Sequence, residues 1–524
     1  MKKAKKLFSA LLAISLALSC ALAGCGNKQQ SDPGSGPAST TAPGGNSGTA
    51  APARDTLNYG MPQEPGKLDP QNDSLLVTKM TNKQLYDTLF VVDEDKNICP
   101  NLATEWKWAD DLTLEVTIRD DVTFHNGEKL TAADVAYTLE RCATGNATAT
   151  LYASFDVENT VVTDDTHLTI KMKSPYASAL NILANAISGI VCKSYAQSVD
   201  ETTFGREPIG SGAFKFVEWV SGDHITLVRN DDYWGQKPAY TNLNLRIIND
   251  NSARAMELET GGIDLTDSLN IADVTRFKEN PNIEAYTVPS TKVVYMAFNE
   301  SHPILSNEKV RLAIAHAIDA QSVCKMAYGD GAILATSSMP STLYGYKNVG
   351  LHEYDVDLAK QLLAEAGYAD GFSFNTVCPS VAASIKTAEA VKAFLAAVNI
   401  DMTIEQYDAA TWRGTKLRDG SADSAPYNLT ADTYDPDQNY MHLYADSGFV
   451  TVSTKDETVN RLLEEGRGET DNEKRLAIYA DYIKEHAIEI PLVENIISYA
   501  AQPYVKGFIP DVGVQPDLKY IYFE

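Results

Sequence analysis

The strongest constraint on the fold is the repeated passage from an amphipathic helix pattern into a strand pattern. Residues 389–408, EAVKAFLAAVNIDMTIEQYD, run from a helix pattern directly into a strand pattern. Residues 355–371 place Leu358, Leu362 and Leu363 on one helical face. Helix followed by strand at this spacing predicts α/β units built around a sheet.

Elements of both kinds also occur earlier in the chain. Residues 112–118, LTLEVTI, alternate apolar and polar side chains and predict a half-buried strand. Thr131, with Asp134 three residues later, predicts the N-cap of a helix. His125 lies beside an Asn-Gly turn at 126–127, and we interpret it as a packed or hydrogen-bonded turn residue rather than a ligand-binding one.

The later patterns are of the same two kinds. Residues 224–230 and 243–250 predict strands on either side of a turn-rich segment. Residues 306–329 carry apolar side chains on one helical face and predict a helix that ends near Gly329. Residues 208–214, PIGSGAF, predict a turn that enters a strand, because their glycines lack the spacing of a nucleotide-binding motif.

The start of the chain has the layout of an export signal. A basic end and an apolar run over 7–22 are followed by small residues and Cys25. A spanning anchor is the weaker interpretation, since the run is of about minimum length and contains several Ala and Ser residues. The sequence LAGC resembles the lipobox of bacterial lipoproteins. This resemblance implies that residues 1–24 are a signal peptide, which is cleaved off together with Cys20. Cys25 would then be the lipidated first residue of the mature protein.

The segment after Cys25 contains almost nothing that could be buried. Residues 27–53 are dominated by Ser, Gly, Pro, Thr and Ala, so no core can offset their ordering entropy. We therefore interpret 25–54 as a lipidated cysteine with a flexible tether, whose reach is on the order of 30 Å.

Charge and cysteine content limit the possible partners. Cleavage before Cys25 leaves 40 basic residues against 70 acidic ones, a formal net charge of −30. Such a surface argues against nucleic acid and anionic lipid as partners. Five widely spaced cysteines indicate neither a disulfide framework nor a zinc site, and one disulfide of unknown pairing stays possible. They are Cys99, Cys142, Cys192, Cys324 and Cys378.

The acidic stretch LTADTYDPDQNYMHLY, residues 429–444, admits a calcium loop, a clamp for a cationic ligand or a solvated turn. With Asp435 as the first position of a calcium loop, Tyr440 stands where the sharp turn needs Gly. Asp446 likewise stands where a bidentate Glu is needed, so we do not predict a metal site. Asp435 and Asp437 are interpreted as turn formers, Asp435 preceding Pro436.

Four long stretches, taken in chain order, resemble the extracellular solute-binding proteins of ABC importers, specifically the peptide/nickel-type family 5. They are NLATEWKWADDLTLEVTIRDDVTFHNGEKLTAADVAYTLER, PIGSGAFKFVEWVSGDHITLVRNDDYWGQKP, VVYMAFNESHPILSNEKVRLAIAHAID and DVDLAKQLLAEAGY. The resemblance extends over residues 57 to about 520. It implies an α/β, two-lobed periplasmic-binding-protein type II fold with a hinge, and an extra subdomain in the first lobe.

The resemblance also implies a discontinuous order of domains, with hinge segments near Val294 and Ile488. The first lobe would comprise 55–91, 208–294 and 488–524, its extra subdomain 92–207, and the second lobe 295–487. A monomer would capture a peptide or other small solute by closing its lobes, without a cofactor, and deliver it to a membrane permease. It would be lipid-anchored at the outer face of the cytoplasmic membrane, as in Gram-positive bacteria.

In peptide-binding members, an Asp in an AD..DP-like stretch receives the α-ammonium group of the ligand. The sequence ADTYDP carries this role to Asp432, because a carboxylate in a closing cleft forms a strong charge-assisted hydrogen bond. Trp412 aligns with a pocket aromatic of the family, and a core tryptophan is an equal alternative. Tyr434 is a further candidate for the same pocket.

The chain departs from the peptide-binding pattern around Asp432. Leu429 stands where those members usually have Trp, and Pro426 stands where they have an Arg that receives a peptide carboxylate. An Arg is also missing after Cys378-Pro379. These departures argue against a short peptide held at both ends.

Three hypotheses therefore stay open. The first is an importer receptor for peptides, and the second is the same receptor for a nickel or metal chelate, an oligosaccharide or another nutrient. The third is a surface-anchored hydrolase with the same lobes, although no GxSxG, HExxH, GxxxxGK[ST] or GxGxxG motif supports an enzyme.

Overall fold

The computed structural model describes residues 54–431, 433–443, 451–469, 471, 474–475 and 483–524. Residues 53–524 form one compact unit. The predicted signal peptide, Cys25, the predicted tether up to residue 53, and Asp432 lie outside the described residues. Among the helices that are described, none is long and apolar enough to cross a membrane.

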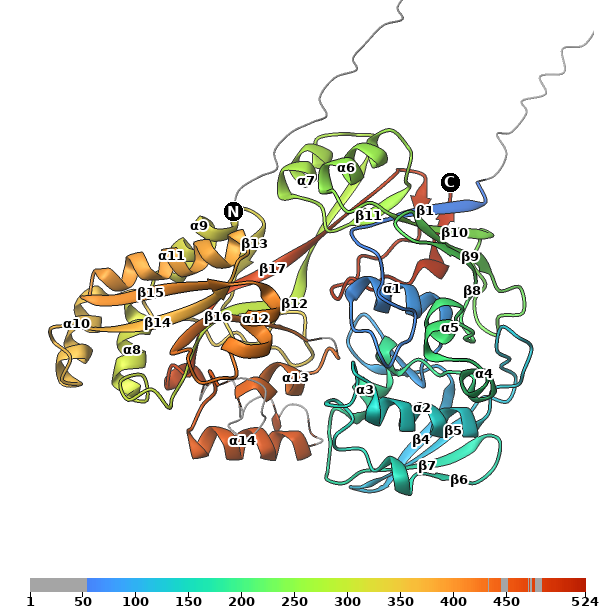
Figure 1. Cartoon of the computed structure of the whole chain (residues 1–524), viewed down its shortest axis with the longest axis horizontal. Helices are drawn as coiled ribbons and strands as arrows, with labels where there is room; N and C mark the ends of the chain where they lie inside the picture. Colours follow the sequence, from blue (N-terminus) through green and yellow to red (C-terminus); the bar gives the residue numbers. More distant parts are fainter. Residues whose placement is uncertain (1–53, 432, 444–450, 470, 472–473, 476–482) are drawn as a thin grey trace, which may run out of the picture. The chain divides into compact units, whose positions relative to one another are not determined.

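The described residues form an eleven-stranded mixed sheet, drawn in Figure 1. Its strand order is β15-β14-β16-β12-β17-β11-β1-β10-β9-β8, with β13 paired to β17. The strands are β1 (Thr56–Met61), β8 (Phe214–Val220), β9 (His224–Arg229), β10 (Asn242–Ile247), β11 (Leu265–Asp267), β12 (Glu284–Phe298), β13 (Ala332–Leu334), β14 (Phe372–Pro379), β15 (Ile400–Tyr407), β16 (Ser424–Thr430) and β17 (Glu489–Ala501).

Three smaller sheets accompany it. A four-stranded sheet has the order β4-β5-β7-β6, and the pairs β2-β3 and β18-β19 stand alone. Their strands are β2 (Phe90–Val92), β3 (Ile98–Pro100), β4 (Ala103–Asp110), β5 (Thr113–Ile118), β6 (Val161–Val162), β7 (His167–Lys171), β18 (Val505–Lys506) and β19 (Tyr522–Phe523).

Helices pack against these sheets. They are α1 (Leu76–Leu85), α2 (Ala132–Thr144), α3 (Ala179–Leu183), α4 (Lys193–Ser198), α5 (Glu201–Arg206), α6 (Asn251–Glu259), α7 (Ile271–Lys278), α8 (Glu308–Ala317), α9 (Ala320–Tyr328), α10 (Val356–Glu365), α11 (Ala382–Ala396), α12 (Ala409–Thr411), α13 (Pro436–Tyr440) and α14 (Glu457–Gly468). Short turns of other helix types are η1 (Val157–Asn159), η2 (Ala186–Ser188), η3 (Trp412–Lys416), η4 (Met441–Leu443) and η5 (Leu518–Tyr520).

The predicted α/β pattern is confirmed where it was strongest. Helix α11 connects β14 to β15, which pair in parallel from Phe372↔Ile400 to Pro379↔Tyr407. Parallel neighbours need such a crossover, and the helix covers one face of the sheet. Leu363 of α10 and Leu395 of α11 are buried in the same core.

The long strands β12 and β17 lie side by side at the centre of the sheet (Figure 1). Strands β14–β16 lie on one side of this pair and β1 and β8–β11 on the other. The antiparallel register shifts between Pro289 and Val293, and again between Val294 and Tyr295. The backbone ladder is therefore irregular at the predicted crossing segment near Val294.

Two local predictions near the N-terminal part are confirmed. Thr131 precedes α2, and its backbone N–H donates to Asp134 Oδ2 over 2.9 Å, one half of a capping box. His125 accepts from the Gly210 N–H at Nδ1 (3.2 Å), so Nε2 carries the proton and donates to Gly212 O (3.0 Å). Burial lowers the pKa of His125 to about 4.

The prediction of one helix over 306–329 was wrong, because the chain forms α8 and α9 instead. Ile318 is extended (φ −105°, ψ 119°) and ends α8. Asp319 then accepts a hydrogen bond from the Ser322 N–H over 3.1 Å and begins α9. An Asp side chain that bonds the backbone two or three residues later favours a cap over a helix interior.

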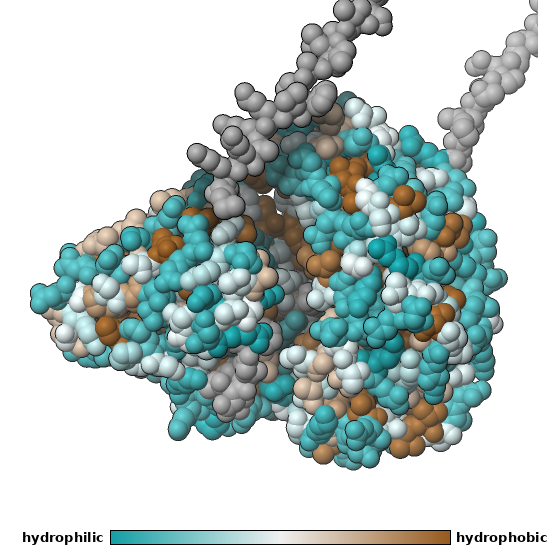
Figure 2. Space-filling model, viewed as in Figure 1, coloured by the Kyte–Doolittle hydropathy of each residue, from teal (hydrophilic) through white to brown (hydrophobic). Residues whose placement is uncertain are grey.

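The described cysteines are all free thiols, Cys99 partly exposed and the other four buried. Figure 2 shows a mostly hydrophilic surface, with hydrophobic residues in small separate groups. Such scattered exposure is ordinary for a water-soluble surface.

Candidate ligand-binding site

The acidic stretch forms the connection between β16 and the short helix α13. Ala431, directly after β16, donates its N–H to Thr291 O of β12 over 2.9 Å. Asp435 caps α13, since its carboxylate accepts from the Asp437 N–H over 2.8 Å. Pro436 occupies the first turn, where its missing N–H costs nothing.

Asp435 also takes part in a buried ion pair that sequence reasoning missed. Its two carboxylate oxygens accept from Nη1 and Nη2 of Arg475 at 2.7 and 2.6 Å. The Ser178 hydroxyl donates to Asp435 Oδ1 over 2.7 Å and accepts from Arg475 Nη2 over 3.0 Å. The stretch is thus fixed to residues distant in the sequence, and Asp435 is not a solvated acid.

Asp437 is also paired with an arginine. Its Oδ1 lies 3.1 Å from Nε of Arg467, and the Tyr176 hydroxyl donates to Oδ2 over 3.3 Å. Burial raises the pKa of Asp437, and the positive charge of Arg467 opposes that shift. Within the described part of the chain, no group of three or more His, Cys, Asp or Glu side chains is arranged to hold a metal ion.

Tyr434 adopts a left-handed backbone conformation with φ of 57°. Its hydroxyl donates to the carboxylate of Asp511, at 3.3 Å from Oδ1 and 3.1 Å from Oδ2. The ammonium nitrogen of Lys96 lies over its ring, 5.4 Å from the ring centroid. This aromatic side chain is only partly buried. Its predicted role in a ligand pocket stays a prediction.

Trp412 lies at the start of η3 and is only 4% exposed. Its indole Nε1 donates to Val377 O over 3.2 Å, and its ring centroid lies 6.1 Å from that of Tyr427. These contacts match the alternative of a core tryptophan, and a ligand contact stays a prediction. Leu429, in the place of the family's Trp, is buried in the same core.

The end of the stretch is tied to the central strands by His442. Its Nε2 lies 2.5 Å from Glu489 Oε1 of β17 and 2.8 Å from the Tyr295 hydroxyl of β12. His442 and Glu489 are both fully buried as side chains. The sequence around His442 did not predict this pair, because its partner Glu489 is 47 residues away.

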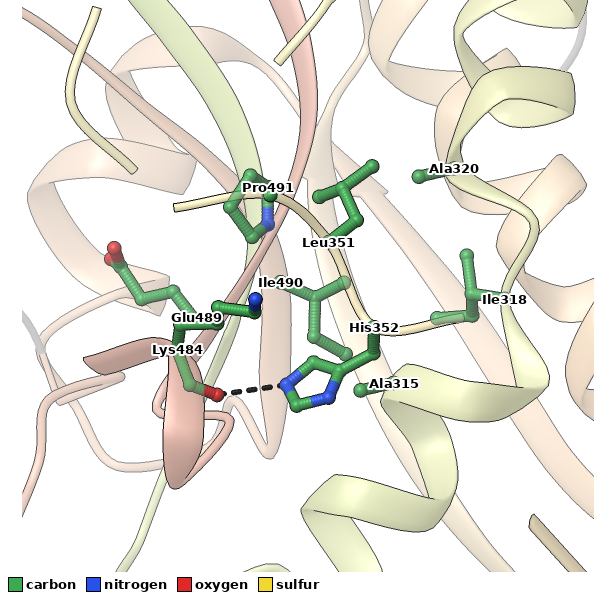
Figure 3. A pocket seen from close by; sticks show the side chains of 10 residues that line it. Ala315, Ile318, Ala320, Leu351, His352, Lys484, Glu489, Ile490 and Pro491 are labelled. Atoms are coloured by element: carbon green, nitrogen blue, oxygen red, sulfur yellow. Dashed lines mark hydrogen bonds between the residues drawn. The ribbon is translucent and has the colours of Figure 1, made fainter. Parts of the chain in front are cut away.

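Glu489 also lines a small pocket, shown in Figure 3. The view includes His352, whose Nε2 donates to Lys484 O over 2.8 Å. Leu351 and Pro491 add apolar walls, and the pocket has room for about 10 Å³. A space of this size suits a water molecule and is too small for a peptide.

A larger cavity of about 460 Å³ lies elsewhere, lined by His302, Asp423 and Lys455 among others. The β12–β16 register runs from Lys292↔Thr430 to Phe298↔Ser424, and this cavity lies at the Phe298 end. The acidic stretch leaves the sheet at the Thr430 end, and at its far end Leu443 O accepts the Thr454 N–H over 3.1 Å, beside the lining residue Lys455.

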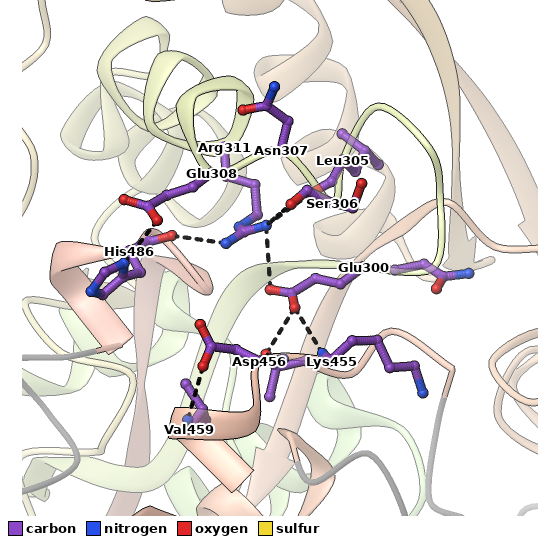
Figure 4. A network of polar contacts seen from close by, with 12 residues as sticks. Glu300, Leu305, Ser306, Asn307, Glu308, Arg311, Lys455, Asp456, Val459 and His486 are labelled. Atoms are coloured by element: carbon purple, nitrogen blue, oxygen red, sulfur yellow. Dashed lines mark hydrogen bonds and ion pairs between the residues drawn. The ribbon is translucent and has the colours of Figure 1, made fainter. Parts of the chain in front are cut away.

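The network next to this cavity is structural (Figure 4). Glu300 Oε2 accepts from the Thr454 hydroxyl and the Lys455 N–H at 2.9 and 2.7 Å. Arg311 lies 3.5 Å from Glu300 Oε1 and donates to Leu305 O over 3.1 Å. These bonds join the loop 299–307, helix α8 and the loop that precedes α14.

Comparison with known proteins identifies the class. Residues 97–450 match the family model described as bacterial extracellular solute-binding proteins, family 5 Middle. This chain belongs to that family. Its members are substrate-binding receptors of ABC importers that act outside the cytoplasm, and are not enzymes, so the hydrolase hypothesis is set aside.

Individual relatives are similar over most of the chain. Heme-binding protein A of Haemophilus influenzae is 26% identical over 465 residues, 82% of this chain and 85% of that protein. Glutathione-binding protein GsiB of Salmonella paratyphi A is 27% identical over 471 residues, which are 86% of this chain and 91% of that protein. The DppA structure from Helicobacter pylori, in complex with the peptide STSA, has a TM-score of 0.73 at 26% identity and covers 90% of this chain and 98% of that one.

The predicted fold class is confirmed by these likenesses. The mixed α/β architecture is the two-lobed periplasmic-binding-protein fold of family 5. The domain boundaries proposed from the sequence stay predictions.

Proposed function

We propose that this chain is a lipid-anchored receptor that captures peptides outside the cytoplasmic membrane and delivers them to an ABC permease. Cys25 would carry the anchor, residues 25–54 the tether, and the host would be Gram-positive. The acidic surface and the receptor family support a small-solute ligand, and the peptide complex of the Helicobacter pylori relative supports a peptide.

In this proposal the lobes close around the ligand. The first lobe comprises 55–91, 208–294 and 488–524, with 92–207 as its extra subdomain, and the second comprises 295–487. The register shifts of β12 around Val294 support a hinge, because an irregular ladder bends more readily than a regular one. A ligand that binds the closed state better shifts the population toward closure.

Asp432 would bind the ammonium group of the peptide. The observation that carries this assignment is the fixed position of its neighbours. Ala431 is bonded to Thr291, and Asp435 is held by Arg475 and Ser178. The charge-assisted hydrogen bond between a carboxylate and an ammonium group is stronger than a neutral one, which favours affinity. Trp412 and Tyr434 would contribute to the same pocket.

A second candidate ligand is a nutrient other than a peptide, such as a metal chelate, heme or an oligosaccharide. Leu429 and Pro426 depart from the peptide-binding pattern, and one relative is named for heme binding. Such a ligand would not need the carboxylate of Asp432.

Calorimetric titration of the mature protein with tri-, tetra- and penta-alanine tests the proposal, with the N-acetylated peptides as controls. We expect saturable binding that N-acetylation weakens about tenfold or more, because it removes the ammonium group. Binding of a nickel chelate, heme or an oligosaccharide, with no heat from any peptide, would favour the second candidate.

A further inference from the structure

A polar contact joins two parts of the chain that have separate hydrophobic cores. One core packs the four-stranded sheet against α2 and α3, and its members include Phe155 and Ile182. The other core lies around α13 and α14 and includes Tyr440 and Leu463. By the predicted boundaries, the first part is the extra subdomain and the second belongs to the second lobe. A polar contact between separate cores opens more readily than a core does.

Hydrogen bonds from the segment that begins α3 cross this contact. The Ser178 hydroxyl donates to Asp435 Oδ1 over 2.7 Å, and the Tyr176 hydroxyl donates to Asp437 Oδ2 over 3.3 Å. These four residues are at most 5% exposed. Because a charged acceptor strengthens a hydrogen bond, the two contacts hold the parts together more firmly than neutral bonds would.

Further groups extend the contact to α14 and to the residue after Asp432. The Ala177 N–H donates to Arg467 O over 2.8 Å, and the Arg467 guanidinium lies over the Tyr176 ring, 5.2 Å from its centroid. Asn181 Nδ2 donates to Thr433 O over 3.3 Å. The contact lies between α13 and α3 in Figure 1.

The turn 433–437 therefore connects the candidate ligand stretch to the opposite side of the molecule. Its Tyr434 hydroxyl also donates to Asp511, which the predicted boundaries place in the first lobe. Bonds between two lobes exist only when the lobes are together, so they stabilise the closed arrangement and contribute nothing to the open one.

We propose that residues 176–181, the turn 433–437 and Arg467 form a latch that holds the lobes closed and sets how readily the cleft opens. The Asp435–Arg475 pair lies on one side of the latch, so opening withdraws Ser178 from it and leaves the carboxylate paired. The groups released can bond water instead, which keeps the latch reversible. The latch requires the two-lobed fold and does not depend on which ligand the cleft takes.

Amide hydrogen exchange measures the opening of the latch without any ligand. The Ala177 N–H is bonded across the contact, whereas the Ile182 N–H is bonded within α3 to Ser178 O over 3.0 Å. Tyr176→Phe combined with Ser178→Ala should speed exchange at Ala177 about tenfold or more and leave Ile182 unchanged.

A matched control removes a hydroxyl that does not cross the contact. The Ser198 hydroxyl donates to Tyr195 O over 2.8 Å within the same part of the chain, so Ser198→Ala should leave exchange at Ala177 unchanged. Faster exchange at Ala177 and Ile182 together would mean that α3 itself unfolds, and this result would overturn the latch. Unchanged exchange at Ala177 in the double variant would overturn it as well.

A disulfide across the contact provides a second test. A Cβ on Gly468, at the end of α14, would lie 3.6 Å from Cβ of Pro175, within the range of about 3.5–4.5 Å found in disulfides. Pro175→Cys/Gly468→Cys should therefore form a disulfide with diamide, identified by mass spectrometry of the linked peptides. A Cβ on Gly414 meets no atom of the described residues within 4 Å, so Pro175→Cys/Gly414→Cys is the control. A Gly468 pair that reacts no faster than the Gly414 pair would overturn the latch.

Tri-alanine then separates the latch from the peptide proposal. The Pro175→Cys/Gly468→Cys protein, oxidised in the absence of peptide, should not bind tri-alanine, and reduction should restore binding, because the ligand enters only an open cleft. Equal binding by the oxidised and reduced protein would overturn the latch. If neither form binds tri-alanine while Ala177 exchange responds as expected, the peptide proposal fails and the latch is upheld.

Discussion

Arg475 and Asp435 form a two-bonded ion pair with both side chains almost fully buried, 1% and 4% exposed. The pair joins residues 40 positions apart and fixes the turn that follows Asp432. Ser178 completes it from a segment more than 250 residues away. The candidate site is therefore held by three distant segments and not by the local sequence alone.

Breaking this pair should strongly destabilise the protein. Arg475→Met leaves Asp435 charged and buried without its partner, so the free energy of unfolding should fall by about 3–5 kcal/mol. Denaturant unfolding measures this change. Arg461→Met, which removes an exposed pair with Glu465, is the matched control and should cost about 0.5 kcal/mol or less. Equal effects of the two variants would contradict the importance of the buried pair.

His125 should make stability depend on pH. Its pKa in the folded protein, about 4, lies below the ordinary value of 6.5, so the folded state binds the proton more weakly. The contribution of neutral His125 to the free energy of unfolding is therefore complete above pH 6.5. It is lost as the pH falls toward 4, and the total loss is roughly 3 kcal/mol at most. His125→Gln should remove this dependence, while His167→Gln, at an exposed site, should keep it. The unfolding free energy measured between pH 7 and 4 tests both.

Sequence patterns predicted the local elements well, because their causes are local. The capping of α2 by Thr131 and Asp134 and the hydrogen-bonded turn at His125 depend on residues a few positions apart or on burial of one turn. The helix break at Ile318 was missed because apolar periodicity continues across it, while Asp319 offers the backbone an alternative partner.

The candidate site was less predictable, because its contacts are long-range. Nothing near Asp435 indicated Arg475 or Ser178, and nothing near His442 indicated Glu489.

Substitution of Asp432 tests the ammonium contact directly. Asp432→Ala and Asp432→Asn should each weaken peptide binding by about tenfold to a hundredfold, because a charge-assisted hydrogen bond is lost. Asp370→Ala, an exposed acid, is the control for net charge. Peptide affinity that stays within about a factor of two in Asp432→Ala would show that this carboxylate is not the clamp.

The lipid anchor has a separate test. Cys25→Ser should release the protein from the membrane into the medium, because no acyl chain can then be attached. Cys20→Ser should leave the protein membrane-bound, since Cys20 departs with the signal peptide. Detergent-phase partitioning of cell extracts measures both. A Cys25→Ser protein that stays in the membrane fraction would indicate a spanning anchor instead.

Mass spectrometry of the ligand released when the natively purified protein is denatured tests the central claim most directly. A peptide receptor should release a set of peptides with free amino termini, in amounts approaching one per protein, and Asp432→Ala should release far less. Release of a metal chelate, heme or an oligosaccharide, undiminished by Asp432→Ala, would contradict the account.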